Sequence, residues 1–166
     1  MKRAFLLLAP YALVVGHLLW SWNDLRDPVA TRFDMAGNAV DTMGRDAFVL
    51  TMTSVATFLL VTFAGISWLI PKMPVSLINL PHKDYWLHPS RRDATFDAIQ
   101  NSMTLYLFVT MALLLVLDIE IVRNNVHTSE ARLSPWLVLG TYLAAITVLT
   151  VRFVLRFRRP AVMDPD

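Results

Sequence analysis

Four long apolar stretches dominate the pattern of hydrophobic and polar positions along the chain. They cover residues 4–22, 47–70, 99–122 and 136–154, and each contains few or no charged residues. A helix of about 20 apolar residues crosses the hydrocarbon core of a bilayer, which is about 30 Å thick. The pattern therefore predicts an all-α polytopic membrane protein, with four transmembrane helices packed as a bundle in a single transmembrane domain over residues 1–166.

Polar positions around these stretches predict where the helices end. Ser90, followed three residues later by Asp93, is typical of a helix N-terminus, so the third helix is expected to begin near residue 91, before its apolar part. The predicted helices then cover residues 4–22, 47–70, 91–122 and 136–158. They leave an outer loop over residues 23–46 and an inner loop over residues 71–90, whose prolines and aromatic residues predict a segment folded against the bilayer surface.

Composition agrees with a membrane protein and excludes several other classes. Hydrophobic residues make up 55% of the chain and charged residues only 17%, below the roughly 25% usual in soluble domains. The 166 residues leave no room for a separate soluble domain, and a net charge of +2 is too small to suggest a nucleic-acid partner. The absence of cysteine excludes disulfides, thiol catalysis and cysteine metal sites.

The distribution of Lys and Arg predicts the orientation in the membrane. Ten of the 15 basic residues lie in the N-terminal segment, around the inner loop and after the fourth apolar stretch, which are on one side if the chain crosses four times. Basic residues near helix ends favour the cytoplasmic side. Both termini are therefore expected to be cytoplasmic.

The outer loop carries turn-forming residues and several aspartates. Pro28 fixes one backbone angle, and Gly37-Asn38 suits a tight turn. Asp34 and Asp41 can cap turns through their own backbone. Three interpretations follow: a structured connector, a recognition surface for a partner or peptide, and, least favoured, a metal site formed by the two aspartates, since calcium requires a denser array of oxygens.

The loop sequences also resemble those of a known family. Residues 25–41, with Phe33-Asp34, Gly37 and Asp41, are similar to the signature of the bacterial SdpI-type integral membrane family, which includes toxin-immunity and signalling proteins. The resemblance covers residues 1–95 and includes the inner loop. The chain departs from the family at two positions, with Arg26 where the family has proline and Arg32 where it has histidine.

This resemblance implies a small protein of the bacterial cytoplasmic (inner) membrane whose outer loop has a defined shape. Both loops supply candidate site residues. The candidates for partner binding in the outer loop are Pro28, Arg32, Phe33, Asp34, Gly37 and Asp41; the candidates in the inner loop are Asn79, Pro81, Lys83, Tyr85 and Trp86.

Ionisable residues at membrane depth form a second group of candidates. His17 in the first helix and Asp118 in the third are expected at similar depths and can pair if these helices are neighbours. Glu120 faces nearly the opposite way from Asp118 and is expected to pair with Arg123 three residues later. The first pair is interpreted as a structural polar lock or as a proton-accepting site of a transporter; alternatively, both side chains simply reach the headgroups.

Basic residues cluster at the end of the fourth helix. Arg152, Arg156, Arg158 and Arg159 are expected to form a basic rim that binds anionic lipid headgroups, with a protein-docking site as the alternative.

No pattern in the sequence calls for an enzyme. Signature motifs for nucleophilic, phosphate-binding or dinucleotide chemistry are missing, and the spacing of His82, Asp84 and His88 is unsuited to a metal site. No catalytic residue, cofactor or metal is expected. The leading hypothesis is a non-enzymatic binding, immunity-like or signalling protein, or an accessory subunit, with membrane lipids and another membrane protein or a second copy as partners. The alternative is a small transporter or channel component that uses His17 and Asp118.

Overall fold

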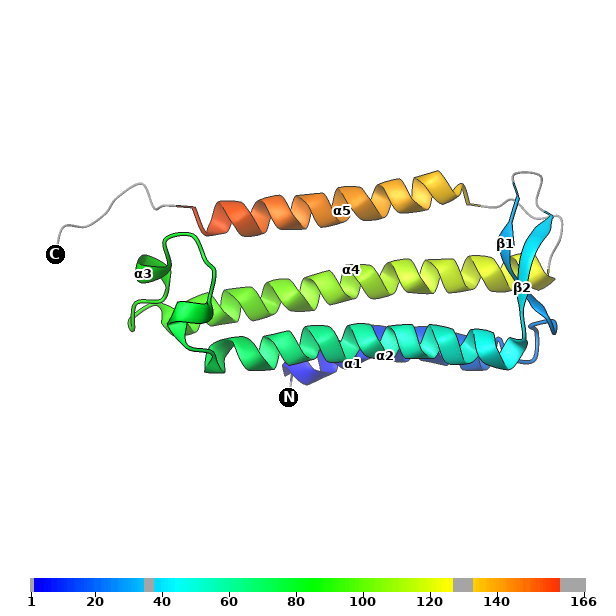
Figure 1. Ribbon diagram of the computed structural model, residues 1–166, viewed down its shortest axis with the longest axis horizontal. Helices are drawn as coiled ribbons and strands as arrows, with labels where there is room; N and C mark the ends of the chain where they lie inside the picture. The colour runs from blue at the N-terminus through cyan, green and yellow to red at the C-terminus, as the bar shows by residue number, and fades with distance from the viewer. Residues whose placement is uncertain (1, 35–37, 127–132, 159–166) are drawn as a thin grey trace.

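The computed structural model describes residues 2–34, 38–126 and 133–158, with side chains described from residue 6 onward. Four long helices lie side by side, with a small sheet at one end and short helical turns at the other (Figure 1). The elements are α1 (Lys2–Trp20), β1 (Val29–Phe33), β2 (Ala39–Met43), α2 (Arg45–Leu69), η1 (Ile70–Lys72), η2 (Val75–Leu77), α3 (Lys83–Trp86), α4 (Arg92–Val126) and α5 (Pro135–Arg156).

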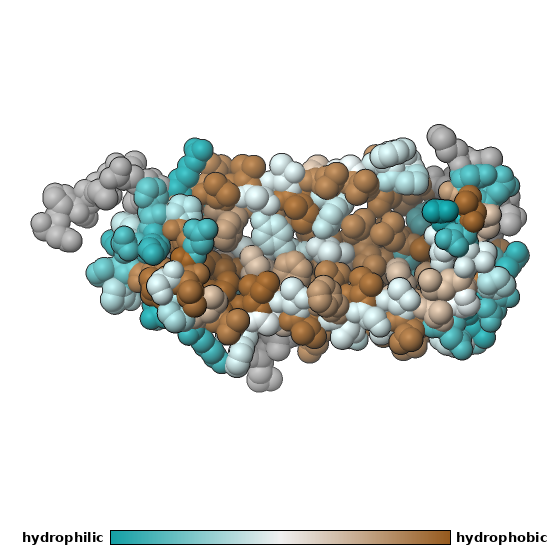
Figure 2. All heavy atoms as spheres, viewed as in Figure 1, coloured by the Kyte–Doolittle hydropathy of each residue, from teal (hydrophilic) through white to brown (hydrophobic). Residues whose placement is uncertain are grey.

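For three of the four predicted spans, the structure contains a helix that is long and apolar enough to cross a membrane. The continuous helical segments Arg45–Lys72, Arg92–Val126 and Pro135–Arg156 are long and apolar enough to cross a membrane. The described part of α1 contributes a shorter apolar helix, Leu6–Trp20, so the count of four spans stays a prediction. An apolar belt covers the middle of the molecule in Figure 2, with hydrophilic residues gathered at both ends, as expected for a bilayer protein.

The all-α class needs one correction, because part of the outer loop forms an antiparallel two-stranded sheet of β1 and β2. In β1, Val29, Thr31 and Phe33 alternate with smaller or polar residues, and β-branched and aromatic residues favour strands. The strand is only five residues long, which is too short to stand out beside apolar stretches of 20 residues.

Helix α4 is the central element of the bundle and packs against α1, α2 and α5. The main core lies where α1, α2 and α4 meet and contains the fully buried Val14, Leu18, Ala56, Leu107 and Met111. Helix α5 packs mainly along α4, and none of its residues, all of which are described, is buried. Three helices thus form a tight group, and the fourth lies beside it.

The helices alternate in direction. Helices α1 and α4 run toward the sheet, whereas α2 and α5 run away from it (Figure 1). The start of α1 and the end of α5 therefore both point toward the end that carries α3. In this article, the "hairpin end" is the end with β1 and β2, and the "α3 end" is the opposite one.

The inner loop folds onto the α3 end instead of forming a free linker. Leu80 and Leu87 are buried in a second apolar cluster with Phe96 of α4 and Phe157, which follows α5. The indole Nε1 of Trp86 donates a hydrogen bond to the Phe157 carbonyl at 3.2 Å. The prediction that this loop is packed and not free is consistent with these contacts, although the packing described is against helix ends.

Candidate functional site at the hairpin end

The outer loop is built around the β1–β2 hairpin. Val29 pairs with Met43 and Phe33 with Ala39, with irregular register between them. At the turn, the Asn38 backbone N–H donates to Asp34 Oδ1 at 2.7 Å, and its side-chain Nδ2 donates to Asp34 Oδ2 at 2.9 Å. The Asp34 carboxylate thus closes the hairpin, as the turn-capping interpretation of this residue requires.

A buried asparagine attaches the hairpin to α4. The Asn125 side chain is 5% exposed; its Oδ1 accepts a hydrogen bond from the Ala30 N–H at 2.8 Å, and its Nδ2 donates to the Ala30 carbonyl at 2.9 Å. The same Nδ2 also donates to the Ile121 carbonyl one helical turn earlier, at 2.8 Å. One amide group therefore satisfies both backbone groups of Ala30, as a neighbouring strand would.

Apolar and charged contacts on either side support this attachment. Leu25 and Val29 are buried in the main core, so the segment entering β1 is anchored among the helices. At the start of α2, the Arg45 N–H donates to Asp27 Oδ1 at 3.2 Å, and the Arg45 guanidinium lies 5.2 Å from the centre of the Trp22 ring. The hairpin is a fixed platform at the end of the bundle.

The outer-loop residues predicted to bind a partner are distributed over this platform. Pro28, joined by a cis peptide bond to Asp27, and Arg32 are exposed, and Phe33 is half-buried. Arg32 lies opposite Asp41 across the two strands, an arrangement in which opposite charges attract. Gly37 lies outside the described residues.

Strand β2 is the most exposed part of the platform. All five of its residues are exposed, including the apolar Val40 and Met43. Because the sheet has two strands among the described residues, the side of β2 away from β1 has no strand paired with it there and leaves backbone donors and acceptors for another chain.

The predicted polar pair lies directly below the platform. His17 Nδ1 of α1 and Asp118 Oδ2 of α4 are 2.5 Å apart, a contact that needs one proton between the two atoms. Asp118 is fully buried, and the His17 side chain is 18% exposed. Asp118 lies seven residues before Asn125, about 10 Å along α4.

The second oxygen of this carboxylate has no partner in the described structure. Asp118 Oδ1 is buried and makes no hydrogen bond with any described residue. Next to the pair, the Ser21 hydroxyl donates to the His17 carbonyl at 2.8 Å, and the Trp20 ring lies 6.0 Å from the His17 ring between centres. Glu120 pairs with Arg123 at 3.1 Å, away from His17, as its position on the helix predicts.

The inner-loop candidates lie at the opposite end of the bundle and do not join this site. Asn79, Pro81 and Lys83 are exposed, whereas Tyr85 and Trp86 are half-buried. The Arg91 guanidinium stacks 4.2 Å from the centre of the Tyr85 ring. The Ser90 hydroxyl, expected to cap the third helix, lies 2.9 Å from His88 Nδ1. Trp86 and Tyr85 thus act as packing residues, and the three exposed residues form a separate surface.

The basic residues after the fourth apolar stretch also lie at the α3 end. Arg152, Arg156 and Arg158 are all exposed, and the first two also line a cavity between α4 and α5. Arg159 lies outside the described residues. The structure therefore separates the two arginines on α5 from the others, a distinction that the sequence pattern did not suggest.

Sequence reasoning missed Asn125 altogether. The available signal was an Asn124-Asn125 pair at the end of a long apolar helix. Only the second of these is buried, since Asn124 bonds the Glu120 carbonyl within its own helix. Helical periodicity places Asn125 seven residues after Asp118, on the same face toward the bundle.

The structure thus combines three helices long and apolar enough to cross a membrane with a small structured hairpin outside the apolar belt. No three His, Asp or Glu side chains gather into a metal-binding group among the described residues. No family model, curated protein or solved structure matches this chain.

Proposed function

We propose that this chain is a non-enzymatic protein of the bacterial cytoplasmic membrane that binds a partner through the β1–β2 hairpin. In this proposal four helices cross the bilayer, both termini are cytoplasmic, and the hairpin faces outward, as the ten-to-five distribution of basic residues favours. The partner is another membrane protein or an extended peptide segment. An immunity-like or signalling role, or that of an accessory subunit, follows from the resemblance of both loops to the SdpI-type family.

The observation that supports this proposal is the fixed hairpin with an exposed edge. Asn125, Leu25 and Val29 hold β1 in place, and β2 stays exposed along its whole length. A pre-ordered edge strand binds an extended segment through backbone hydrogen bonds without first paying for loop ordering. A plain connector between two helices needs neither this anchoring nor an exposed Val40.

Site-specific photocrosslinking in native membranes tests the proposal. A photoreactive amino acid replaces Val40 on β2, and the matched control places it at Phe58, an apolar residue of α2 that is 68% exposed within the apolar belt. We expect a discrete protein adduct from position 40 that is missing from position 58, and mass spectrometry identifies the partner. Lipid adducts alone from both positions would overturn the proposal.

A second candidate function rests on a different observation. The pairing of His17 with Asp118, whose second carboxylate oxygen is buried and unpartnered among the described residues, supports a proton-accepting site in a small transporter or channel component. Proton flux into proteoliposomes distinguishes the two candidates. If His17→Ala abolishes a pH-driven flux while the protein stays folded, the transporter is favoured; if there is no flux from the wild type, the pair is a packing lock.

A further inference from the structure

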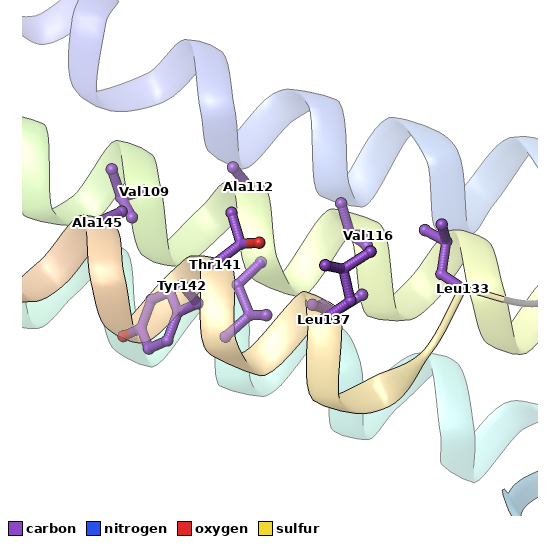
Figure 3. Close-up of a pocket in the computed structure, with 10 residues that line it drawn as sticks. Val109, Ala112, Val116, Leu133, Leu137, Thr141, Tyr142 and Ala145 are labelled. Carbon is purple, nitrogen blue, oxygen red and sulfur yellow. The ribbon is translucent and has the colours of Figure 1, made fainter.

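The seam between α4 and α5 contains two sizeable open cavities. Toward the hairpin end, the seam contains an apolar cavity of about 320 Å³, lined by Val, Leu and Ala side chains with Thr141 and Tyr142 (Figure 3). Toward the α3 end it contains a second cavity of about 310 Å³. Because α5 has no buried residue, this seam is only partly closed by protein.

The second cavity has the chemistry of an anion site and lies on the same seam as the apolar cavity. Arg152 and Arg156 of α5 line it from one side, and Asn101, Ser102 and Tyr106 of α4 line it from the other, with Phe153 among its apolar walls. Within the described chain, neither arginine has a carboxylate or hydrogen-bond partner. Two guanidinium groups one helical turn apart, next to hydroxyl and amide groups, suit a phosphate.

The depth of the seam matches one leaflet of a bilayer. Arg152 lies 11 residues from Thr141 of the apolar cavity, about 16 Å along α5, which is about half of the 30 Å hydrocarbon core. A molecule with a phosphate at the arginines and an apolar chain along the seam would therefore reach from the headgroup region to the bilayer midplane.

We propose that the α4–α5 seam is a binding site for one anionic phospholipid of the leaflet at the α3 end, with its phosphate held by Arg152 and Arg156. This goes beyond a general basic rim, because it assigns a bound lipid to one cavity and separates these two arginines from the remaining basic residues at that end. The inference does not depend on partner binding at the hairpin, which lies at the other end of the bundle.

Native mass spectrometry of the detergent-solubilised protein tests this site, with phosphatidylglycerol, phosphatidylcholine and inorganic phosphate as probes. We expect one phosphatidylglycerol to bind in preference to phosphatidylcholine. A basic group near anionic lipid contributes about a factor of five to binding, so the double variant Arg152→Gln, Arg156→Gln should weaken the first phosphatidylglycerol by about 25-fold.

The charge-matched control is the double variant Lys72→Gln, Arg91→Gln. These cations also lie at the α3 end but contact the Trp68 and Tyr85 rings and do not line the cavity. It should change the affinity by less than about twofold, since neither cation lines the cavity and the detergent-solubilised protein has no anionic bilayer surface nearby. If both double variants lose the same affinity for phosphatidylglycerol, the lipid is held only by general charge attraction, and the proposal is overturned.

Filling the cavity without changing charge separates a bound lipid from a charged surface. Ser102→Phe places an aromatic ring in the cavity. Leu105→Trp is a second variant that should disturb folding less, because the Leu105 side chain lines the cavity and is 46% exposed. Either variant that keeps the wild-type melting temperature should lose the bound phosphatidylglycerol. Wild-type binding by both, equal binding of phosphatidylcholine, or displacement of the lipid by inorganic phosphate would each overturn the assignment, the last indicating a site for free phosphate.

Discussion

Replacing Asn125 with alanine should release the hairpin from the bundle while leaving the helices folded. The substitution removes three hydrogen bonds from a site that is 5% exposed, two of them to Ala30 and one to the Ile121 carbonyl. The bond to Ile121 lies within α4, so only the two bonds to Ala30 attach the hairpin; at about 1 kcal/mol for each, the expected cost to the attachment is about 2 kcal/mol. That corresponds to an increase of about 30-fold in the fraction of molecules with the hairpin detached.

Hydrogen exchange of the protein in nanodiscs measures this fraction. The informative amides are those of β2 that face β1, because they do not touch Asn125 and are protected only while the hairpin is formed. A two-stranded hairpin is at best marginally stable by itself, so detachment from α4 should unfold it. The β2 peptide should therefore exchange about 30-fold faster in the Asn125→Ala variant.

The neighbouring residue supplies the control. Asn124→Ala removes an asparagine of the same helical turn whose side chain bonds only the Glu120 carbonyl, at 2.7 Å, among the described residues. Exchange in β2 should stay at the wild-type rate. If Asn125→Ala changes the exchange of β2 by less than about threefold, under 1 kcal/mol, the asparagine does not hold the hairpin and the buried Leu25 and Val29 carry the attachment alone.

Two further predictions concern the polar pair and the orientation. In a double-mutant cycle with His17→Ala and Asp118→Ala, unfolding in mixed micelles should give a coupling energy of about 1 kcal/mol, which is within the range for polar contacts between membrane helices. If the losses of stability in the two single variants simply add in the double variant, the 2.5 Å contact adds no stability. Because the chain contains no cysteine, single cysteines can be introduced and labelled to test the orientation. A membrane-impermeant maleimide should modify the Asp41→Cys variant in intact spheroplasts, but the Asn79→Cys variant only after lysis. The reverse pattern would show that the proposed topology is inverted.

The sequence predicted the helices well because each depends on a simple local property, a long apolar run. The hairpin depends on something that no local pattern shows. A two-stranded sheet is marginal alone, and this one is anchored by Asn125, 95 residues away from Ala30 in the chain. The turn chemistry of Asp34 and Asn38 was visible in the sequence, but not the strands that it connects or the helix to which they attach.

The same distinction applies to the candidate site. The helical rise per residue was sufficient to place His17 and Asp118 at similar depth in the membrane. Their contact also requires α1 to lie next to α4, and a similar depth does not determine which helices are neighbours. The aromatic residues of the inner loop signalled a packed segment. Their partner, Phe157, lies 71 residues from Trp86, and nothing in the sequence around Phe157 indicates that it packs against the inner loop.

Polar contacts made by α4 explain how the bundle is organised. In a bilayer, apolar packing between helices gains little over packing against lipid, so small numbers of polar contacts have a large influence on which helices are neighbours. Helix α4 makes such contacts with every other part: Asp118 with α1, Gln100 with the Ser67 carbonyl of α2, Tyr106 with α5 and Asn125 with the hairpin.

The strength of these contacts differs along the molecule. At the hairpin end, Asn125 and Asp118 are buried, and the platform is fixed to the tightly packed group of α1, α2 and α4. On the other side of α4, α5 is joined by the exposed Tyr106–Thr150 hydroxyl pair at 3.0 Å and a longer Thr110–Tyr142 pair at 3.5 Å. Along most of its length α5 is therefore joined to α4 by few polar contacts, while its end is fixed by the buried Phe157, whose carbonyl accepts a hydrogen bond from Trp86. A bundle built this way concentrates its buried polar contacts at the hairpin end and leaves the α4–α5 seam as its less tightly packed side.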